Sequence, residues 1–309
     1  MQDRTDGVGK ERSWEAGRPV DLRGTLAPLA RGTGDPAHRF VAGRFWWACA
    51  TPEGNATIAL AAHGSLVSAA AWGDGADWLL DRVPALLGAG DDWSAVDVRP
   101  YPALHRVLRT SPGLRLCASG LIFDALVPCI LEQKVTGHEA RRSWRTLLRW
   151  YGAVAPGPTP VPMRVPPSAS VVREVPSWDW HRMGVDLKRS ATIRAAASIA
   201  NRLEECTAMS PADALTRLRY VPGVGEWTAA ETAQRAIGHP DAVSVGDFHL
   251  KNWVVHALTG RARGTDAEML ELLAPWAGQR QRVVRLIELS GLGAPRFGPR
   301  FAPNDIRAI

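Results

Sequence analysis

The chain has 309 residues, of which 46% are hydrophobic and 22% are charged. This length allows two domains with buried cores, and the composition is that of an ordinary globular protein. No apolar run approaches the roughly 20 residues of a membrane span, and Met1–Arg18 lacks the apolar core of a signal peptide. We therefore expect a cytoplasmic protein with no membrane partner.

The net charge of +6 is unevenly distributed. Residues 1–108 carry 11 Lys and Arg against 13 Asp and Glu, whereas the rest of the chain carries 26 against 18. The positive charge therefore belongs to the C-terminal two thirds, which favours a polyanionic partner. A generic basic surface is the alternative that charge alone leaves open.

The cysteines are scattered, with no C-x-x-C pair and no histidine at zinc-ligand spacing. They are Cys49, Cys117, Cys129 and Cys206. We expect reduced, mostly buried thiols and no metal site.

The N-terminal third reads as a tail followed by a small α+β domain. Residues 1–17 are predicted to be a disordered tail, and residues 18–108 to form the domain, in which turn residues separate short strands and a helix follows. The predicted strands are Val20–Leu26, Phe40–Cys49, Ala56–Ala61 and Ser65–Ala71; the turns are Gly32–Asp35 and Pro52–Asn55; the helix is Asp77–Leu87.

Residues 109–309 are predicted to form a helical domain, because apolar residues there recur at helical spacing. The predicted helices are Leu121–Leu131, Gly137–Trp150, Ser177–Met183, Leu187–Leu203, Pro211–Leu218, Ala267–Ala274 and Gln279–Leu289. Ser210 is the expected N-cap of the helix at Pro211, and the Pro-rich stretch 154–170 is predicted to be an extended surface connection. The fold class is thus mainly α with an N-terminal α+β domain.

A tight Pro-Gly-Val-Gly turn at residues 222–225 separates two predicted helices. Gly223 and Gly225 permit positive φ and leave backbone N–H groups accessible at a helix N-terminus, where the dipole favours an anion. A DNA phosphate is the natural ligand of such a turn, and the contact carries no base-sequence information. Val221 and Val224 are expected to pack the hairpin between its helices.

Asp247 follows the apolar residues Val243 and Val245 and the conformationally permissive Gly246. It stands at or near the start of another predicted helix. An aspartate in this place is often an N-cap, which is one interpretation of Asp247. A catalytic carboxylate is the other.

The run from Pro222 to Lys251 resembles the helix-hairpin-helix plus Gly/Pro-Asp signature of the base-excision DNA glycosylase superfamily. In that family a catalytic aspartate follows the hairpin at a characteristic distance, and Asp247, 25 residues after Pro222, occupies the matching position. The likeness is greatest to the bacterial alkylation-repair branch, 3-methyladenine DNA glycosylase II. It extends over roughly residues 18–290 and includes segments 123–136, 183–188 and 275–276.

The resemblance implies the helix-hairpin-helix glycosylase architecture and a base-excision repair enzyme acting on double-stranded DNA at the bacterial nucleoid. It would flip out 3-methyladenine or 7-methylguanine and hydrolyse the N-glycosidic bond, with Asp247 as catalytic carboxylate. Trp227 and Trp276 would line the base pocket, although core packing is the alternative for both. Glu231 also falls in the pocket by this likeness, where the branch has a tyrosine; it would favour cationic bases or face elsewhere.

The same likeness assigns six residues to DNA binding. They are Gly223, Gly225, Val224, Thr228, Gln133 and Lys134. Lys134 lies where the branch uses an apolar wedge to fill the gap left by the flipped base, so it would fill that gap less well or reach a phosphate. For Gln133 a plain surface position is the alternative.

Trp227 stands where bifunctional glycosylase-lyases of this superfamily carry a nucleophilic lysine, which implies a monofunctional enzyme. No iron–sulfur cluster is expected, because no cysteine follows Cys206. No cofactor is required, although the resemblance allows a monovalent cation at the hairpin carbonyls near Arg219, Val221 and Val224. We expect a monomer. The alternatives are a non-catalytic helix-hairpin-helix DNA-binding protein and a glycosylase of the same fold for other lesions.

Overall fold

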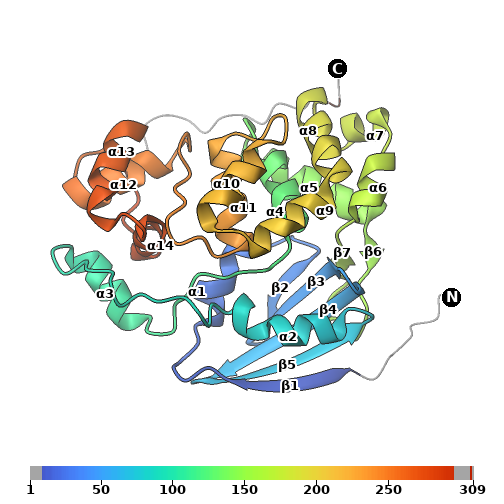
Figure 1. Cartoon of the computed structure of the whole chain (residues 1–309), viewed down its shortest axis with the longest axis horizontal. Coiled ribbons are helices and arrows are strands. Elements are labelled where there is room, and N and C mark those ends of the chain that lie inside the picture. The colour runs from blue at the N-terminus through green and yellow to red at the C-terminus, as the bar shows by residue number, and fades with distance from the viewer. Residues whose placement is uncertain (1–8, 296–306, 308–309) are drawn as a thin grey trace.

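The computed structural model describes residues 9–295 and residue 307, and places a five-stranded antiparallel sheet below a group of helices (Figure 1). The strand order in the sheet is β1-β5-β4-β3-β2. The strands are β1 (Lys10–Glu15), β2 (His38–Val41), β3 (Arg44–Thr51), β4 (Gly54–His63) and β5 (Leu66–Gly73).

The sheet buries apolar side chains on both faces, in keeping with the alternation of side chains along a strand. One face carries the pairs Phe45–Leu60 and Trp47–Ile58 and packs against α2 (Ala76–Leu86). Ala48 and Ala59 on the other face pack near β7 (Arg164–Val165), which pairs with β6 (Ala153–Val154). The predicted α+β domain is therefore confirmed in its main elements.

Two predictions for the first 26 residues were wrong in detail. Residues 10–15, assigned to a disordered tail, form the edge strand β1; its backbone pairs with β5 and only Trp14 packs on the core, so its sequence is polar. The predicted strand Val20–Leu26 contains instead the short helix α1 (Leu22–Leu26), whose N-cap Asp21 accepts from Gly24 N. Residues 1–8 of the predicted tail lie outside the described residues.

The predicted strand Phe40–Cys49 is a hairpin rather than one strand. Ala42 and Gly43 turn the chain between β2 and β3 with φ of 48° and 75°. Two positive φ angles give the tight turn that matches the twist of paired strands. Because Ala-Gly lacks the Asn-Gly or Asp-Gly signal of such turns, the sequence pattern did not show it.

Apart from β6 and β7 the remaining chain is mainly helical, as predicted, although α3 and α6 were not among the predicted helices. The helices are α3 (Pro102–Thr110), α4 (Ile122–Leu131), α5 (Gly137–Tyr151), α6 (Ala169–Glu174), α7 (Ser177–Arg182), α8 (Leu187–Ser198), α9 (Ala200–Glu204), α10 (Pro211–Arg219), α11 (Glu226–Ala236), α12 (Leu250–Thr259), α13 (Asp266–Leu273) and α14 (Arg280–Ser290). The predicted helix Leu187–Leu203 is interrupted at Ile199, where φ is −123°. Ser210 caps α10 through Asp213 N, as expected.

Helix α4 is the apolar centre of the helical part, because all of its residues are buried except Asp124, which is half-buried. It packs against α11, α8 and α5. A separate core joins α12, α13 and α14 to residues 93–116, so α3 packs on α14 and the predicted boundary at residue 108 falls inside α3. Among the residues that the structure describes, no helix combines the length and the hydrophobicity that a membrane span requires.

Asp35 joins the sheet domain to the helices. Its buried carboxylate accepts from Arg31 N, Ala37 N and the indole Nε1 of Trp144 on α5, and it pairs with His38 at 3.0 Å. Burial opposes ionisation, but His38 and the backbone donors hold the pKa of Asp35 at about 2. Asp35 therefore stays charged and fixes the predicted turn 32–35 against α5.

Two carboxyl groups lie at the start of α4. Glu204 of α9 accepts from Ile122 N and Phe123 N, each at 2.8 Å, and so caps α4 from another helix. Burial, together with the negative charges of Glu204 and Asp35, raises the pKa of Asp124 to about 8. Asp124 thus costs stability when it ionises.

Asp124→Asn is expected to stabilise the fold increasingly as the pH rises from about 4 to about 8. The pKa of Asp124 lies above its usual 3.8, so the folded state retains a proton that the unfolded state loses between these values. Stability from this group is therefore full below about pH 4 and is lost as the pH rises to about 8. Relative to wild type, the variant should gain on the order of a few kcal/mol across that range. Urea unfolding at several pH values measures it, and parallel curves for the two proteins would contradict it.

Candidate active site

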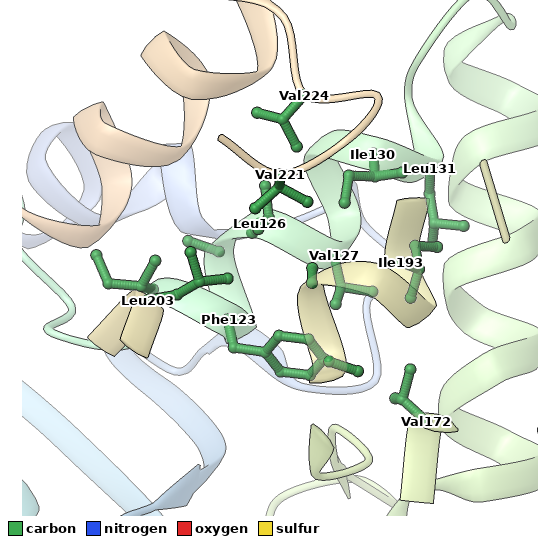
Figure 2. Close-up of a cluster of buried hydrophobic side chains, with 14 of the residues drawn as sticks. Phe123, Leu126, Val127, Ile130, Leu131, Val172, Ile193, Leu203, Val221 and Val224 are labelled. Carbon is green, nitrogen blue, oxygen red and sulfur yellow. The ribbon is translucent and has the colours of Figure 1, made fainter. Parts of the chain in front are cut away.

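The hairpin lies between α10 and α11, as the sequence predicts. Gly223 has φ of +88°, and a Cβ atom at this position would lie 2.0 Å from the Thr192 side-chain oxygen of α8. Only glycine fits both the backbone conformation and this close approach. Val221 and Val224 are buried and lie over α4 near Leu126 (Figure 2), so they fasten the hairpin to the core as expected.

Helix α11 begins at Glu226 without a side-chain cap, because its N-cap residue is Gly225. The first N–H groups of a helix have no partner within the helix, and here the cap residue has no side chain to accept from them. A Cβ atom added to Gly225 would meet nothing within 4 Å. The start of α11 thus presents N–H donors and the positive end of the helix dipole, which suit an anion.

Gln133 holds the hairpin from the turn between α4 and α5. Its Nε2 atom donates to Gly223 O at 3.0 Å and to Thr228 Oγ1 at 2.8 Å. Thr228 is buried, whereas the neighbouring Lys134 is exposed with φ of +53°. The structure therefore brings Gln133, Lys134, Gly223 and Thr228 together.

Asp247 lies just before α12, in the segment 242–249, which we call the Asp247 loop. Its Oδ1 atom accepts from His249 N at 2.7 Å and from Leu250 N at 2.9 Å. Asp247 lies two residues before His249, the N-cap residue of α12, and these two bonds resemble those by which an aspartate caps a helix. They use only one carboxylate oxygen, so capping and a second role for Asp247 are compatible.

The second oxygen of Asp247 faces α11. Oδ2 accepts from the indole Nε1 of Trp227 at 3.0 Å, and both side chains are partly exposed. Trp227 is the second residue of α11, directly after the hairpin. One hydrogen bond thus joins the carboxylate to the helix end that can hold an anion.

The Asp247 loop is anchored on two sides, in part by Ser244, Gln234 and Asp266, which the sequence patterns did not single out. Ser244 donates to Glu231 Oε1 at 2.5 Å and accepts from Gln234 Nε2 at 3.0 Å. Gly246 N donates to Asp266 Oδ1 of α13 at 3.0 Å. The only sequence signal was the polar character of these residues, which many surface residues share.

Glu231 is engaged on both carboxylate oxygens. Arg235 donates to Oε2 at 2.6 Å and Ser244 to Oε1, and the side chains of Glu231 and Arg235 are 14% and 15% exposed. Burial alone would raise the pKa of Glu231, but Arg235 and the Ser244 hydroxyl hold it below its usual value. The structure therefore places Glu231 in an ion pair beside the Asp247 loop.

Trp276 has the contacts of a core residue. It is buried, its indole Nε1 donates to Asp97 O at 2.8 Å, and its ring lies 5.7 Å from that of Tyr101. It belongs to the core of α12, α13 and α14 together with Leu250, the first residue after the Asp247 loop. The structure joins Trp227 directly to Asp247, and it joins Trp276 to Asp247 only through this core.

Lys251, the lysine nearest to Asp247 in sequence, pairs with Asp266 at 3.3 Å. Within residues 9–295 and 307, the structure holds no group of three or more His, Cys, Asp or Glu side chains that could bind a metal ion. The four cysteines are free and buried, as predicted, and burial raises the pKa of each thiol.

No family model and no curated protein matches this sequence. Solved structures do match. "3-methyladenine DNA-glycosylase from Archaeoglobus fulgidus" has a TM-score of 0.73 at 14% identity, over 90% of this chain and 97% of its own. A Clostridium acetobutylicum 8-oxoguanine glycosylase/lyase in complex with double-stranded DNA has a TM-score of 0.67 at 11% identity, over 91% and 96%. The Schizosaccharomyces pombe 3-methyladenine DNA glycosylase with abasic DNA has a TM-score of 0.52 at 14% identity, over 66% and 97%. The chain therefore has the fold of the helix-hairpin-helix DNA glycosylases.

Proposed function

We propose that this chain, with the fold of the helix-hairpin-helix glycosylases, is a base-excision repair enzyme. It hydrolyses the N-glycosidic bond of alkylated bases of the 3-methyladenine and 7-methylguanine type in double-stranded DNA. The observation that carries the proposal is the Trp227–Asp247 hydrogen bond, which joins a carboxylate to the anion-suited start of α11. A DNA strand held at the hairpin would thus bring a nucleotide to Asp247.

Positive charge on the chain favours the first association with DNA. The C-terminal two thirds of the chain carries the excess of Lys and Arg, which favours association with a polyanion. Backbone N–H groups at Gly225 and the first turn of α11 then hold one phosphate without reading bases. Gln133 keeps the hairpin in shape, and Lys134 beside it is exposed to the strand. Val224 and Thr228 act through the packing of the hairpin.

The target nucleotide must leave the base stack, at a cost of a few kcal/mol, before its sugar can reach Asp247. The glycosidic bond breaks through an oxocarbenium-like transition state. The Asp247 carboxylate, fixed by two backbone N–H groups and the Trp227 indole, stabilises that positive charge and orients a water molecule. A preorganised carboxylate needs little rearrangement as the charge develops.

Alkylated bases suit this site because they carry positive charge and leave readily. The ring of Trp227, beside Asp247, offers cation–π attraction to such a base. The enzyme acts without a lyase step, because Trp227 occupies the position where the glycosylase-lyases carry a nucleophilic lysine. The nearby Lys251 is paired with Asp266. A monomeric state and a monovalent cation at the hairpin carbonyls stay predictions.

The test is base release from methylated duplex DNA, measured by chromatography, with a parallel duplex containing 8-oxoguanine. We expect release of 3-methyladenine or 7-methylguanine, intact abasic strands, and no covalent adduct in the presence of borohydride. Release of 8-oxoguanine alone, with strand cleavage, would contradict the lesion class and the monofunctional mechanism. DNA binding without release of any base would favour a non-catalytic DNA-binding protein.

A further inference from the structure

Glu231 and Ser244 connect the Asp247 loop to the helix that carries Trp227. Ser244 is almost fully buried, and its hydroxyl is fully used: it donates to Glu231 Oε1 and accepts from Gln234 Nε2. Its backbone oxygen accepts from Asp247 N at 3.2 Å. A movement of Ser244 therefore passes directly to the Asp247 backbone.

Glu231 is itself fixed in place. Arg235, one turn along α11, binds the Glu231 carboxylate and its backbone oxygen, and its Nε atom donates to Pro28 O of the sheet domain at 2.8 Å. Gln234 adds a bond to Ala242 O at 3.0 Å. Two side chains of α11, Glu231 and Gln234, thus hold the first half of the loop, and Arg235 fixes Glu231.

The position of the Asp247 carboxylate depends on how the Asp247 loop is placed against α11, because its hydrogen-bond donors come from different elements. Trp227 lies on α11, one turn before Glu231, whereas His249 N and Leu250 N belong to the start of α12. The 3.0 Å hydrogen bond between Trp227 and Asp247 is kept only if the loop does not shift relative to α11. Ser244 is the loop residue that α11 holds by a buried side-chain bond.

We propose that Glu231 is a positioning residue, which holds Asp247 against Trp227 through Ser244 and does not contact the damaged base. This inference rests on the proposed function. Both Glu231 oxygens are occupied and its charge is paired with Arg235, so it has little left to offer a cationic base. Because Glu231 and Ser244 act on the position of the Asp247 carboxylate, they affect the rate of base release for all substrates alike.

Ser244→Ala is the cleaner variant, because it removes the bond to the loop and leaves the Glu231–Arg235 pair intact. Glu231→Gln keeps an acceptor oxygen but leaves the Arg235 cation buried without a counterion, which is destabilising. The thermal unfolding of each variant is therefore measured together with its rate of base release, so that a loss of stability is not mistaken for a loss of activity. Glu288→Gln is the matched control, since it removes a carboxylate from a helical ion pair with Arg285 outside the Asp247 loop.

The rate experiment is single-turnover base release from two different lesions, with DNA affinity measured separately. Misplacing a reacting group by about an ångström costs up to about a hundredfold, so we expect Ser244→Ala to lower both rates by about ten- to a hundredfold. DNA affinity and the ratio of the two rates should stay as in wild type. The double variant with Glu231→Gln and Ser244→Ala should lose less activity than the product of the two single losses. A changed ratio between lesions would show that Glu231 reads the base and would overturn the proposal.

A spectroscopic experiment separates this inference from the proposed function. The indole N–H resonance of Trp227, assigned by its disappearance in Trp227→Phe, reports the bond to Asp247. We expect Ser244→Ala and Asp247→Asn to shift it, and Glu288→Gln to leave it in place. If wild type releases no base yet Ser244→Ala moves the resonance, the proposed function fails and the positioning stands. An unmoved resonance overturns the positioning whatever the activity.

Discussion

Replacing Asp247 with asparagine should lower the rate of base release by at least about a hundredfold, because the negative charge beside the developing oxocarbenium ion is lost. Asparagine is as good an N-cap as aspartate, so the bonds to His249 N and Leu250 N can persist. The fold and the affinity for DNA should therefore change little. Single-turnover release from methylated DNA, with unfolding and DNA-binding measurements on the same protein, tests this.

The matched control is Asp21→Asn, which changes another N-capping aspartate, on α1 of the sheet domain. Its rate of base release should equal that of wild type. A second comparison is Asp247→Ala, which removes the cap as well and should lose about 1 kcal/mol of stability. If Asp247→Asn keeps the wild-type rate, Asp247 is only a helix cap and the catalytic carboxylate must be sought elsewhere.

Gly223→Ala should weaken both the fold and DNA binding. The new Cβ atom would lie 2.0 Å from Thr192 Oγ1, and alanine would have to adopt a φ near +88°. Backbone strain of this kind costs of order 1–3 kcal/mol, and a shifted hairpin should bind DNA about tenfold or more weakly. Thermal unfolding and fluorescence-anisotropy titration with duplex DNA measure the two effects.

Two further glycine variants separate the causes. Gly64→Ala places alanine at φ of +62° in a sheet turn with no atom within 4 Å, so it measures the cost of the conformation alone. Gly225→Ala meets no protein atom, so its stability should be unchanged while a phosphate at the hairpin is obstructed and DNA affinity falls. Equal DNA affinity in wild type, Gly223→Ala and Gly225→Ala would contradict phosphate binding at the hairpin.

The contacts of Glu231 and Trp276 change how a lesion would be recognised. Glu231 forms an ion pair with Arg235, and Trp276 packs on Tyr101 within a core. Trp227 is then the aromatic residue that the structure places in contact with Asp247. Lesion preference in this chain would accordingly depend more on Trp227 than on the other two.

Local pattern was enough to predict the main helices, the hairpin at Gly223 and the place of Asp247 close to a helix start. Helical periodicity, turn glycines and capping residues act over a few neighbouring positions, so a single sequence carries them in full. The same reasoning failed for β1 and for the turn at Ala42. An edge strand takes its bonds from a distant strand, here β5, and the Ala-Gly turn lacks a strong local preference.

Tertiary structure alone decided which side chains meet. Gln133 and Gly223 are 90 residues apart, Arg235 and Pro28 are 207 apart, and Glu204 caps a helix 82 residues before it. Such pairings depend on how the sheet, α4 and α11 pack together, and no local propensity encodes them. The sequence therefore determined that a glycine turn leads into a helix and that a carboxylate follows it, whereas packing decided that Trp227 donates to that carboxylate and that Glu231 faces Ser244.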